Sequence, residues 1–517
     1  MAPSQEPAPG GTPDAVVNTD DTSYRVKCLF AFIDLHAGAK GLPPVSPQFR
    51  HGMRHYEEFP VPLGRELPPL PSRQILLSYV DTFVTNIWPL FPAFDRADLE
   101  ADIQRLLEIQ EAAPSGLKEK ITAKDLPSLA MIYVIACIGI DEKASRVSDE
   151  STQYLQACYS LSAHITGMPY LKSVQALLLL ALALHGQARD GQAWYVVGQA
   201  IRLAQSLGLH KRLPASTKGG YRANHDLHRR LWWSCFSLEK LLQLECGRPS
   251  STYRGDFDRT LPAVPSVSSA DNPPDYFMAW VSLAGILGRI SDRLYSRNFS
   301  NSGELFLEIC ALDQALLDWD RRLPESLRPQ SEGLAYLEEG SHSVLASFLA
   351  QQYFSAQITI LRSSLIFPHQ SFLAEIQKRS SALSPASASR LLRGPALCAG
   401  AARAIAVQTL QLADRRRSTH STVLGAGQAF LAAVVLAFGV LREPASRLAR
   451  ADVELLCSVT EHVEEFYLQW GQDEAFVGIF GQLRERVFGV QVLASRGRSV
   501  TAWRRVLITV TVLCQCR

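Results

Sequence analysis

From Ser72 onwards, the apolar positions of the chain recur with the period of an α-helix. Leu76, Tyr79 and Phe83 follow one another at spacings of three and four residues, which places their side chains on one helical face. Ser72 is of a residue type that caps the first turn of a helix. Pro89 predicts the end of this helix, because proline has no amide donor and its ring clashes with the preceding turn.

Two later segments repeat this pattern. One helix is predicted to begin at Asp190 and to stop at Gly208, because glycine adopts the left-handed cap conformation at no steric cost. Another is predicted from about His225 and should end before Gly247. The apolar faces are Trp194, Val197, Ile201 and Ala204 in the former, and Leu231, Cys235, Leu238 and Leu242 in the latter.

Strand patterns are nearly absent from the body of the chain. Alternating runs of β-branched residues flanked by turn residues are hard to find between residues 72 and 490. The sequence therefore predicts an all-α fold, with one large multi-helix domain over residues 72–490.

The first 71 residues have a different composition. Residues 1–22 are rich in Pro, Gly, Ser, Thr and Asp and offer little apolar surface to bury, so they predict a disordered tail. Residues 23–71 predict one short amphipathic element followed by a Pro-rich connector, because closely spaced prolines exclude a regular helix.

Two other segments depart from the helical pattern. Residues 377–394 are rich in Ser, Ala and Pro and predict a mobile loop between helices. Residues 491–517 form a C-terminal tail that ends in a β-branched stretch, either a terminal strand or the translation of a wrongly drawn gene model.

An uncharged run over residues 421–441 is long enough to cross a bilayer. It contains Gly425, Gly427 and Gln428, and its neighbours are amphipathic rather than apolar. A helix buried in a large all-α protein has the same composition. A core helix is the favoured interpretation, and a membrane-associated protein is the alternative.

Composition and charge exclude several classes of function. Of the 517 residues, 47% are apolar, which is ample for a buried core, and the net charge of +2 is too small to hold nucleic acid by electrostatics alone. The ten cysteines are scattered and mostly lie in apolar runs, so we expect buried free thiols in a reducing compartment. The first residues lack the charged and apolar pattern of a secretory signal.

Catalytic and metal-binding motifs are missing from the sequence. No nucleophile elbow, phosphate loop, zinc-protease motif or dinucleotide fingerprint occurs, so the chain is predicted not to be an enzyme. His225 and His228 precede Cys235 and Cys246 on one predicted helix, but no further ligand converges on them. We therefore assign no metal site and predict no cofactor.

A short basic run consists of Arg415, Arg416 and Arg417. It is a candidate nuclear import signal. A solvated helix end, where cations favour the helix dipole, is the competing interpretation.

Within residues 72–262, three motifs resemble the fungal transcription factor regulatory domain, the middle homology region of zinc-cluster transcription factors. In order they read SYVDTFVTNIWPLFPAFDRADL, then SVQALLLLALALHG with the helix AWYVVGQAIRLAQSLGLHKR, and finally HRRLWWSCFSLEKLLQLECGRPSSTYRGDFDRTLP. The resemblance implies a helical regulator of transcription located in the nucleus. Similar family members often serve specialised-metabolite gene clusters, which implies pathway-specific control.

The resemblance selects a structural motif in the third segment. Its members are Trp232, Trp233, Gly247, Arg248, Pro249 and Asp258. Adjacent tryptophans point to different sides of a helix and so predict packing against two neighbours. For Arg248 we predict a structural clamp onto carboxylates such as Asp256 or Asp258, or onto carbonyls, rather than a ligand contact. Glu239 stands where the family more commonly has aspartate, and the ligand-binding residues stay unknown.

The sequence departs from the family pattern ahead of this domain. Members typically carry there a binuclear zinc cluster of six closely spaced cysteines, or paired zinc fingers, but the first 130 residues contain only Cys28. Either a DNA-binding exon is missing from the gene model, in which case zinc is expected with it, or the protein acts through a partner. The predicted partners are promoter DNA, reached indirectly or through the missing module, and other transcription factors or co-regulators. A homodimer stays open, and no membrane is expected.

Overall fold

A computed structural model of the chain divides into two compact units, Met1–Pro62 and Leu63–Arg517. The structure describes residues 41, 63, 67–113, 116–167, 170–211, 221–252, 275–329, 341–367, 369–379, 383–415 and 423–495. The predicted tail of residues 1–22, most of the connector, Asp258 and residues 496–517 lie outside this set. The fold below is that of the second unit.

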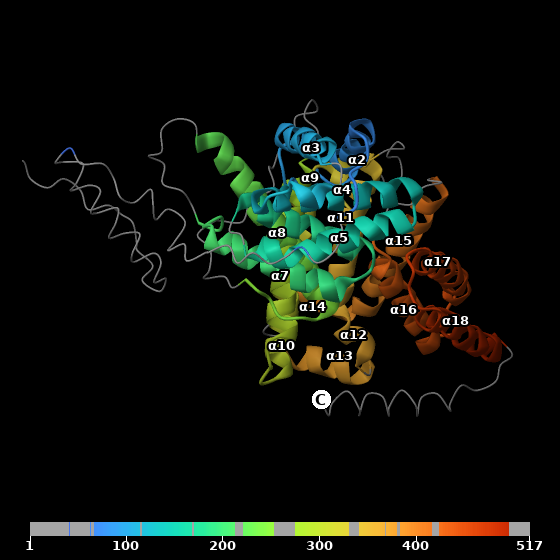
Figure 1. Cartoon of the computed structure of the whole chain (residues 1–517). Coiled ribbons are helices and arrows are strands. Elements are labelled where there is room, and N and C mark those ends of the chain that lie inside the picture. The colour runs from blue at the N-terminus through green and yellow to red at the C-terminus, as the bar shows by residue number, and fades with distance from the viewer. Residues whose placement is uncertain are drawn as a thin grey trace, which may run out of the picture. The chain divides into compact units, whose positions relative to one another are not determined.

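Within the described ranges every regular element is a helix, which confirms the all-α prediction (Figure 1). The α-helices are α2 (Arg73–Asn86), α3 (Arg96–Glu111), α4 (Leu126–Ala144), α5 (Asp149–Thr166), α6 (Leu171–Gly186), α7 (Asp190–Ser206), α8 (Tyr221–Cys246), α9 (Tyr276–Ile290), α10 (Ser302–Arg322), α11 (Ser341–Leu361), α12 (Ser363–Ile366), α13 (His369–Lys378), α14 (Pro385–Leu392), α15 (Gly394–Arg415), α16 (Gly427–Arg442), α17 (Ala449–Gln469) and α18 (Glu474–Ser495).

The first group of helices is built around α4, which packs against α2, α5 and α6 (Figure 1). Every residue of α4 from Leu126 to Glu142 is buried, as its nearly continuous apolar sequence requires. Helix α2 crosses α4 where Gly139 lies against Tyr79, and a Cβ at Gly139 would overlap that side chain.

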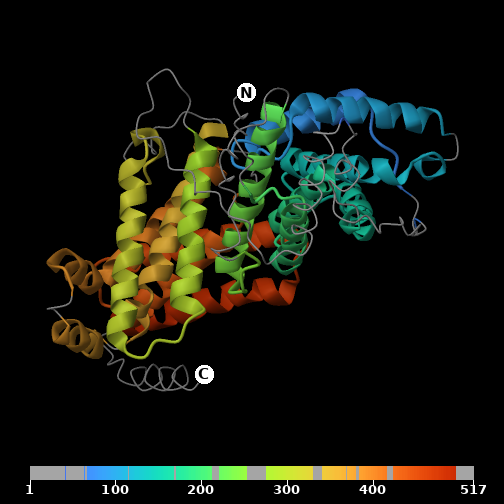
Figure 2. The same ribbon diagram turned by 90° about the vertical axis from the view of Figure 1, so that its left-hand side faces the viewer.

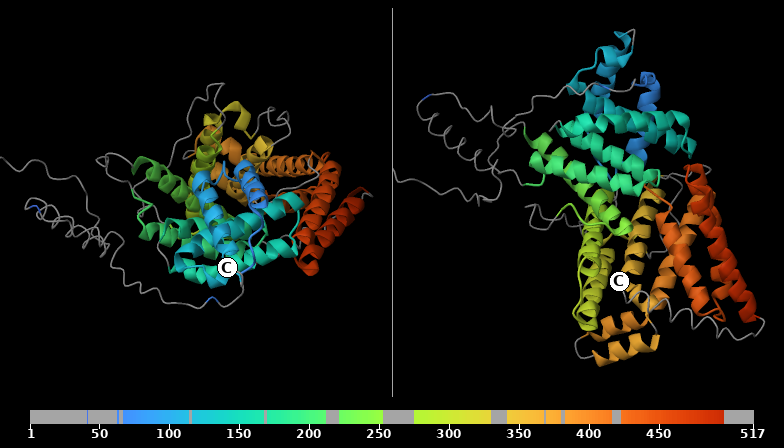
Figure 3. Two further views of the ribbon diagram at one scale, coloured as in Figure 1. Left: turned by 45° about the horizontal axis from the view of Figure 1, so that its top comes forward. Right: turned by 60° about the horizontal axis from the view of Figure 1, so that its bottom comes forward.

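The second group continues from the first through α8, which packs against α7 and α9. Helices α9, α10 and α11 lie side by side (Figure 2), and so do α15, α16, α17 and α18 in sequence (Figure 3). The ring of Trp280 on α9 contacts Phe348 on α11 and Phe91 after α2, with centroid distances of 4.8 and 6.2 Å. One hydrophobic core therefore runs through both groups.

The end of the predicted connector is extended and held by side chains. The carbonyls of Pro68 and Pro69 accept hydrogen bonds from the hydroxyls of Tyr133 (2.6 Å) and Tyr154 (3.0 Å). Because proline carbonyls keep their acceptor capacity, the Pro-rich segment can be fixed without forming a regular element.

The three helices predicted from periodicity form where expected. Helix α2 begins after Ser72, although the Ser72 side chain makes no capping hydrogen bond. Helix α7 ends just before Gly208, whose φ is 76°, and α8 ends at Gly247, whose φ is 61°. Both glycines have the left-handed conformation, which the sequence predicted for Gly208, and Gly247 lies directly after the predicted end of α8.

The prediction of a loop over residues 377–394 is wrong for most of that range. Residues 385–392 form α14, and the Ser384 side chain caps it by accepting a hydrogen bond from the amide of Ser387. The guanidinium of Arg390 forms a bidentate ion pair with Asp313 on α10. This tertiary contact stabilises a helix that its short, polar sequence would not form alone.

Two helices of the described residues are long and apolar enough to span a membrane, Ala123–Ala144 and Gly394–Ala413, with 89% and 28% of the apolar window buried. The former includes α4, the core of the first group. The uncharged run at residues 421–441 forms the shorter helix α16, which buries one face against α15 and α17. That burial supports the core-helix interpretation of this run.

The cysteines of the described part are free thiols, as the sequence predicted. Those with no exposed surface are Cys137, Cys158, Cys235 and Cys398, on α4, α5, α8 and α15. Burial raises the pKa of each of these thiols above its usual value.

Candidate functional site

The turn after α2 is a buried segment whose carbonyls are bound by side chains. Residues Leu90–Phe94 are all buried. Three of its carbonyls accept hydrogen bonds from side chains. Trp88 Nε1 donates to the Phe94 carbonyl (3.1 Å), Gln175 Nε2 to the Ala93 carbonyl (2.8 Å), and Arg230 Nη1 to the Pro92 carbonyl (3.1 Å). The three motifs of the sequence therefore meet at this turn, because Gln175 lies on α6 and Arg230 on α8.

Arg230 links this turn to the start of α8. Its guanidinium also contacts the carboxylates of Asp95 (2.6 Å) and Asp226 (2.8 Å), and lies 5.8 Å from the centroid of the Trp88 ring. Only 13% of the side chain is exposed. Arg230 is thus a buried cation with two carboxylates, a pairing that stabilises a partly desolvated charge.

Both tryptophans of the third motif are buried in the core. The ring of Trp232 lies 5.7 Å from that of His210, next to α7, and Trp233 makes an edge contact with Phe236 at 5.2 Å. Phe236 belongs to α8 itself, so packing of the pair against two neighbouring elements stays a prediction.

Buried Glu239 holds the turn that follows α8. One carboxylate oxygen accepts hydrogen bonds from the Ser250 hydroxyl (3.0 Å) and the Ser251 amide, and the other from the Thr252 hydroxyl (3.1 Å). Lys240 Nζ lies 3.0 Å from the second oxygen. Glu239 has no exposed surface, so these contacts replace all of its hydration.

Lys240 is a buried cation in the same network. Its ammonium also donates to Ser250 (2.6 Å) and Gln243 (3.2 Å), and Gln243 in turn donates to Asp292. The aliphatic part of Lys240 passes over Gly288 on α9, where a Cβ would lie only 2.7 Å from Lys240 Cδ. Gly288 therefore leaves the space that the lysine occupies.

Arg248 lies on the surface of α7. Its Nη1 donates to the Gly191 carbonyl (3.2 Å), and the guanidinium lies 5.0 and 5.4 Å from the ring centroids of Trp194 and Tyr195. The carbonyl belongs to one of the partner types the sequence predicted. Asp258, the predicted carboxylate partner, lies outside the described residues.

The other two residues of the helix stop also have structural positions. Gly247 provides the left-handed residue that ends α8, and the Pro249 carbonyl accepts a hydrogen bond from Trp194 Nε1 (3.3 Å). The turn is thereby attached to α7 as well as to α8.

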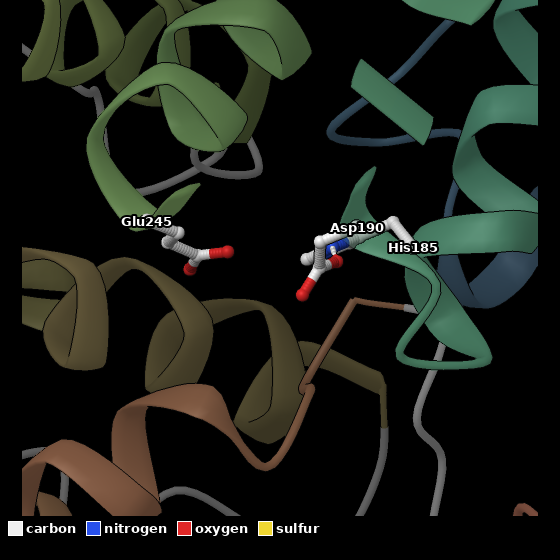
Figure 4. A group of neighbouring side chains, drawn as sticks. All are labelled: His185, Asp190 and Glu245. Carbon is white, nitrogen blue, oxygen red and sulfur yellow. Dashed lines mark hydrogen bonds and ion pairs between the residues drawn. The ribbon is translucent and has the colours of Figure 1, made fainter. Parts of the chain in front are cut away.

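A separate polar cluster lies where α6, α7 and α8 meet α16. His185 Nδ1 is 2.7 Å from an Asp190 oxygen, and the Asp190 and Glu245 carboxylates point toward one another (Figure 4). Gln428 on α16 donates to Glu245. Ligand atoms of His185, Asp190 and Glu245 all lie within 4.8 Å of one another.

The cluster shifts the protonation equilibria of its members. Burial disfavours the charged imidazole, but the hydrogen bond from His185 to Asp190 outweighs burial and raises the pKa of His185 to about 9. Desolvation raises the pKa of Glu245 to about 7, against the attraction of His185. The Glu245 residue is exposed, so solvent reaches this end of the cluster.

Tyr467 on α17 lies close enough to this cluster to interact with both of its carboxylates. Its side chain is 8% exposed and stacks on Phe480, with 6.0 Å between centroids. Burial and the nearby carboxylates of Asp190 and Glu245 raise the pKa of its hydroxyl well above the usual range.

The α6–α7 turn that carries this cluster is fixed by neighbouring groups. Gln187 Nε2 donates to Asp141 Oδ2 (2.9 Å), and the Gln187 carbonyl accepts from Gln472 (3.4 Å). Ala188 has a φ of 54°, a left-handed conformation that is unusual for a residue with a Cβ.

Sequence reasoning missed this cluster because Glu245 lies 60 residues after His185 in the sequence, and because all three members lie near helix ends, where polar residues are common. The polar segment that follows the apolar run of α6 was the available signal. The side chain of His225 lies outside the described part, so the absence of a metal site in the histidine and cysteine pattern at residues 225–246 stays a prediction. Arg415 ends α15, whereas Arg416 and Arg417 lie outside the described residues.

Comparison with known proteins adds a family to these observations. Residues 80–321 match the model of the fungal specific transcription factor domain. The chain is 22% identical, over 77% of its length and 50% of the relative's, to an uncharacterized transcriptional regulatory protein of Schizosaccharomyces pombe. It is 28% identical to an ABC-transporter-regulating transcription factor of Aspergillus oryzae, over 56% of this chain and 32% of the relative. Cutinase transcription factor 1 beta of Fusarium vanettenii is 37% identical over 19% of this chain and 10% of its own length.

Proposed function

Because residues 80–321 belong to the fungal specific transcription factor domain family, we propose that this protein regulates transcription in the nucleus. The observation that carries the proposal is the joining of the three family motifs at the turn over residues 90–94. Trp88, Gln175 and Arg230 each bind a carbonyl of that turn. The motifs thus define one folded regulatory body rather than three unrelated similarities.

We propose that this chain reaches promoter DNA through a separate module or a partner transcription factor. It spans about half or less of the length of the curated relatives named above. Its net charge is +2, and its first 130 residues contain a single cysteine, Cys28, so they cannot form a zinc cluster. Base reading needs an element that enters a groove, and the basic residues of this chain are dispersed.

The regulated genes are proposed to belong to one pathway, such as a specialised-metabolite cluster. The printed names of the Aspergillus and Fusarium relatives, which refer to regulation of ABC transporters and of cutinase, support control of a defined gene set. The proposed role is regulatory rather than catalytic. A homodimer is compatible with this role.

Deletion of the gene followed by transcript profiling tests the role. We expect a limited set of transcripts to change and a tagged protein to be found in the nucleus. Unchanged transcripts, together with a tagged protein in the membrane fraction, would refute the proposal in favour of the membrane-associated alternative.

Binding of the purified chain to candidate promoter DNA tests the mode of action. We expect weak, salt-sensitive binding by the chain alone and tight binding once a partner is added. Tight and sequence-specific binding without a partner would contradict the proposed need for another module, and leave the regulatory role intact.

The chain is further proposed to hold no cysteine-bound zinc. Among the described cysteines, Cys235 and Cys246 share α8 and each of the others lies on a helix of its own, and four of the seven are fully buried. Cobalt added to the purified chain should therefore give no thiolate-to-metal charge-transfer absorption. Such an absorption would show a thiolate site.

A further inference from the structure

Five helices contribute one polar side chain each to the cluster of Figure 4 and its surroundings. These side chains are His185 on α6, Asp190 on α7, Glu245 on α8, Gln428 on α16 and Tyr467 on α17. Tyr467 is 8% exposed, and the charges of both carboxylates raise the pKa of its hydroxyl. The five side chains come from distant parts of the sequence and meet only in the folded chain.

We propose that His185, Asp190 and Glu245 bind a divalent transition-metal ion. Their ligand atoms lie within 4.8 Å of one another, whereas two ligands of one such ion, each at about 2.0–2.2 Å, lie up to about 4.4 Å apart. Small side-chain rotations are enough to close this difference. An imidazole nitrogen with two carboxylate oxygens suits zinc, manganese or iron better than magnesium or calcium, which prefer oxygen alone.

The charges of the cluster also favour a cation. The imidazolium of His185 can balance one carboxylate, and it already contacts Asp190. The described contact of Glu245 is a hydrogen bond from the neutral amide of Gln428. A divalent ion would neutralise both carboxylates and replace the proton on His185 Nδ1. The Tyr467 hydroxyl could then donate to a carboxylate or to a metal-bound water.

The protein holds two of the three ligands in fixed positions. His185 and Asp190 flank the α6–α7 turn, and that turn is attached to Asp141 and Gln472 through Gln187. Fixed ligands lose little freedom on binding, and such supporting contacts commonly change metal affinity about 10- to 100-fold. Glu245 comes from the end of α8, so the ion would connect that helix end to the turn.

The proposed ion would couple two parts of the molecule. Its ligands lie in the family domain of residues 80–321, while Gln428 and Tyr467 come from helices beyond it. Metal binding would thus stabilise the contact of α16 and α17 with the family domain. This inference does not depend on the proposed role in transcription.

Calorimetric titration of the purified full chain, stripped with a chelator, tests the site. We expect Zn²⁺ to bind with a stoichiometry of one and to raise the melting temperature, and Mg²⁺ at the same concentration to do neither. Added Co²⁺ should give d–d absorption bands without thiolate charge transfer. Absence of saturable Zn²⁺ binding, or a Co²⁺ spectrum with thiolate bands, would overturn the proposal.

Matched variants locate the ion. E245Q preserves size and the hydrogen bond with Gln428 but removes the charge, and should weaken Zn²⁺ binding at least about 10-fold. E454Q, at an exposed position of α17, should bind Zn²⁺ like the unaltered chain. D190N is a second variant, which we expect to weaken Zn²⁺ binding to a similar extent. It serves as the test if circular dichroism shows that E245Q does not fold. Unchanged affinity in a folded E245Q or D190N would exclude this site.

Discussion

At the residue scale, some charged groups inside this protein have their partners at turns, while others, such as Asp313, pair with a side chain on a neighbouring helix. Glu239 binds the turn after α8, and Arg230 binds the turn after α2. Turns expose backbone donors and acceptors that helices satisfy internally. A single buried charge can therefore fix the path of a whole connection.

Replacing Glu239 by alanine should destabilise the protein by about 3–5 kcal/mol, because Lys240 would be left as a buried cation without its carboxylate. Denaturant unfolding followed by circular dichroism measures this change. The double variant E239A/K240A should lose less than the sum of the single variants, since the two residues share one network. Additive losses would contradict the coupling.

Asp141 should make stability depend on pH. Burial raises its pKa from 3.8 to about 6, so folding favours the protonated carboxyl. The free energy of unfolding is therefore highest below about pH 4, where Asp141 is protonated in both states, and it falls as the pH rises through about 6. The ionised carboxylate then costs about 3 kcal/mol. D141N should be more stable than the unaltered chain at pH 7.5, and this advantage should vanish near pH 4.

The control for Asp141 is D318N, on the exposed surface of α10. It should show no comparable advantage at either pH. An Asp141 variant that is less stable than the unaltered chain at pH 7.5 would mean that the carboxylate is stabilising in its ionised form.

Arg248 shows what the sequence could predict about a residue and what it could not. Its place after a helix stop was visible in the sequence, and a carbonyl was among the partners that the sequence predicted for it. Gly191, its carbonyl partner, lies 57 residues earlier, and only the packing of α7 against α8 brings them together. Because the described partners are a carbonyl and two rings, R248A should cost about 1–2 kcal/mol, measured by thermal unfolding. A loss of 3–5 kcal/mol would instead indicate a buried carboxylate partner.

At the scale of elements, helix ends were predictable and short helices were not. Gly208 and Gly247 mark two helix ends because only glycine enters the left-handed conformation without strain. Helix α14 was mistaken for a loop, since its stability depends on the ion pair of Arg390 with Asp313, which lies 77 residues away. The candidate metal cluster was missed for the same reason, as its three residues meet only after α6, α7 and α8 have packed.

The contact of α8 with α9 depends on the absence of a side chain at Gly288. G288A should destabilise the protein by about 1–3 kcal/mol, because the new methyl group would overlap the fixed, buried chain of Lys240. G400A is the matched control, since a Cβ at this exposed position of α15 meets nothing within 4 Å. It should stabilise the protein by about 0.5–1 kcal/mol through its higher helix propensity. Equal effects of both changes on the melting temperature would contradict the packing argument.

At the scale of the whole molecule, the family match and the folded unit have different limits. The match ends at Arg321, inside α10, whereas the core continues through α11 to α18. Helix α9 packs against α11, with Trp280 against Phe348 and Trp319 on α10 against Tyr353. The periodicity of the sequence predicted one helical body over residues 72–490, and the limits of the described helices agree closely with that range.

A fragment of residues 63–322 should therefore fail to fold, because removal of α11 exposes the apolar faces of α9 and α10. Residues 63–495 should give a cooperative thermal transition. Size-exclusion chromatography and binding of a hydrophobic dye distinguish the two fragments. A monomeric, dye-negative 63–322 fragment would show that the matched region is an independent domain.

The four fully buried thiols have a consequence for measuring motion in this protein. An alkylating reagent attacks only thiolate that is accessible, so Cys137, Cys158, Cys235 and Cys398 can react only when their surroundings open. The four cysteines lie on different helices, α4, α5, α8 and α15. The alkylation rate of each cysteine-containing peptide therefore reports how often the structure around that helix opens. If the core opens as one unit, mass spectrometry should find the four rates equal. If α15 opens first, Cys398 should be labelled ahead of the others, and the native cysteines would map the order of unfolding without any introduced probe.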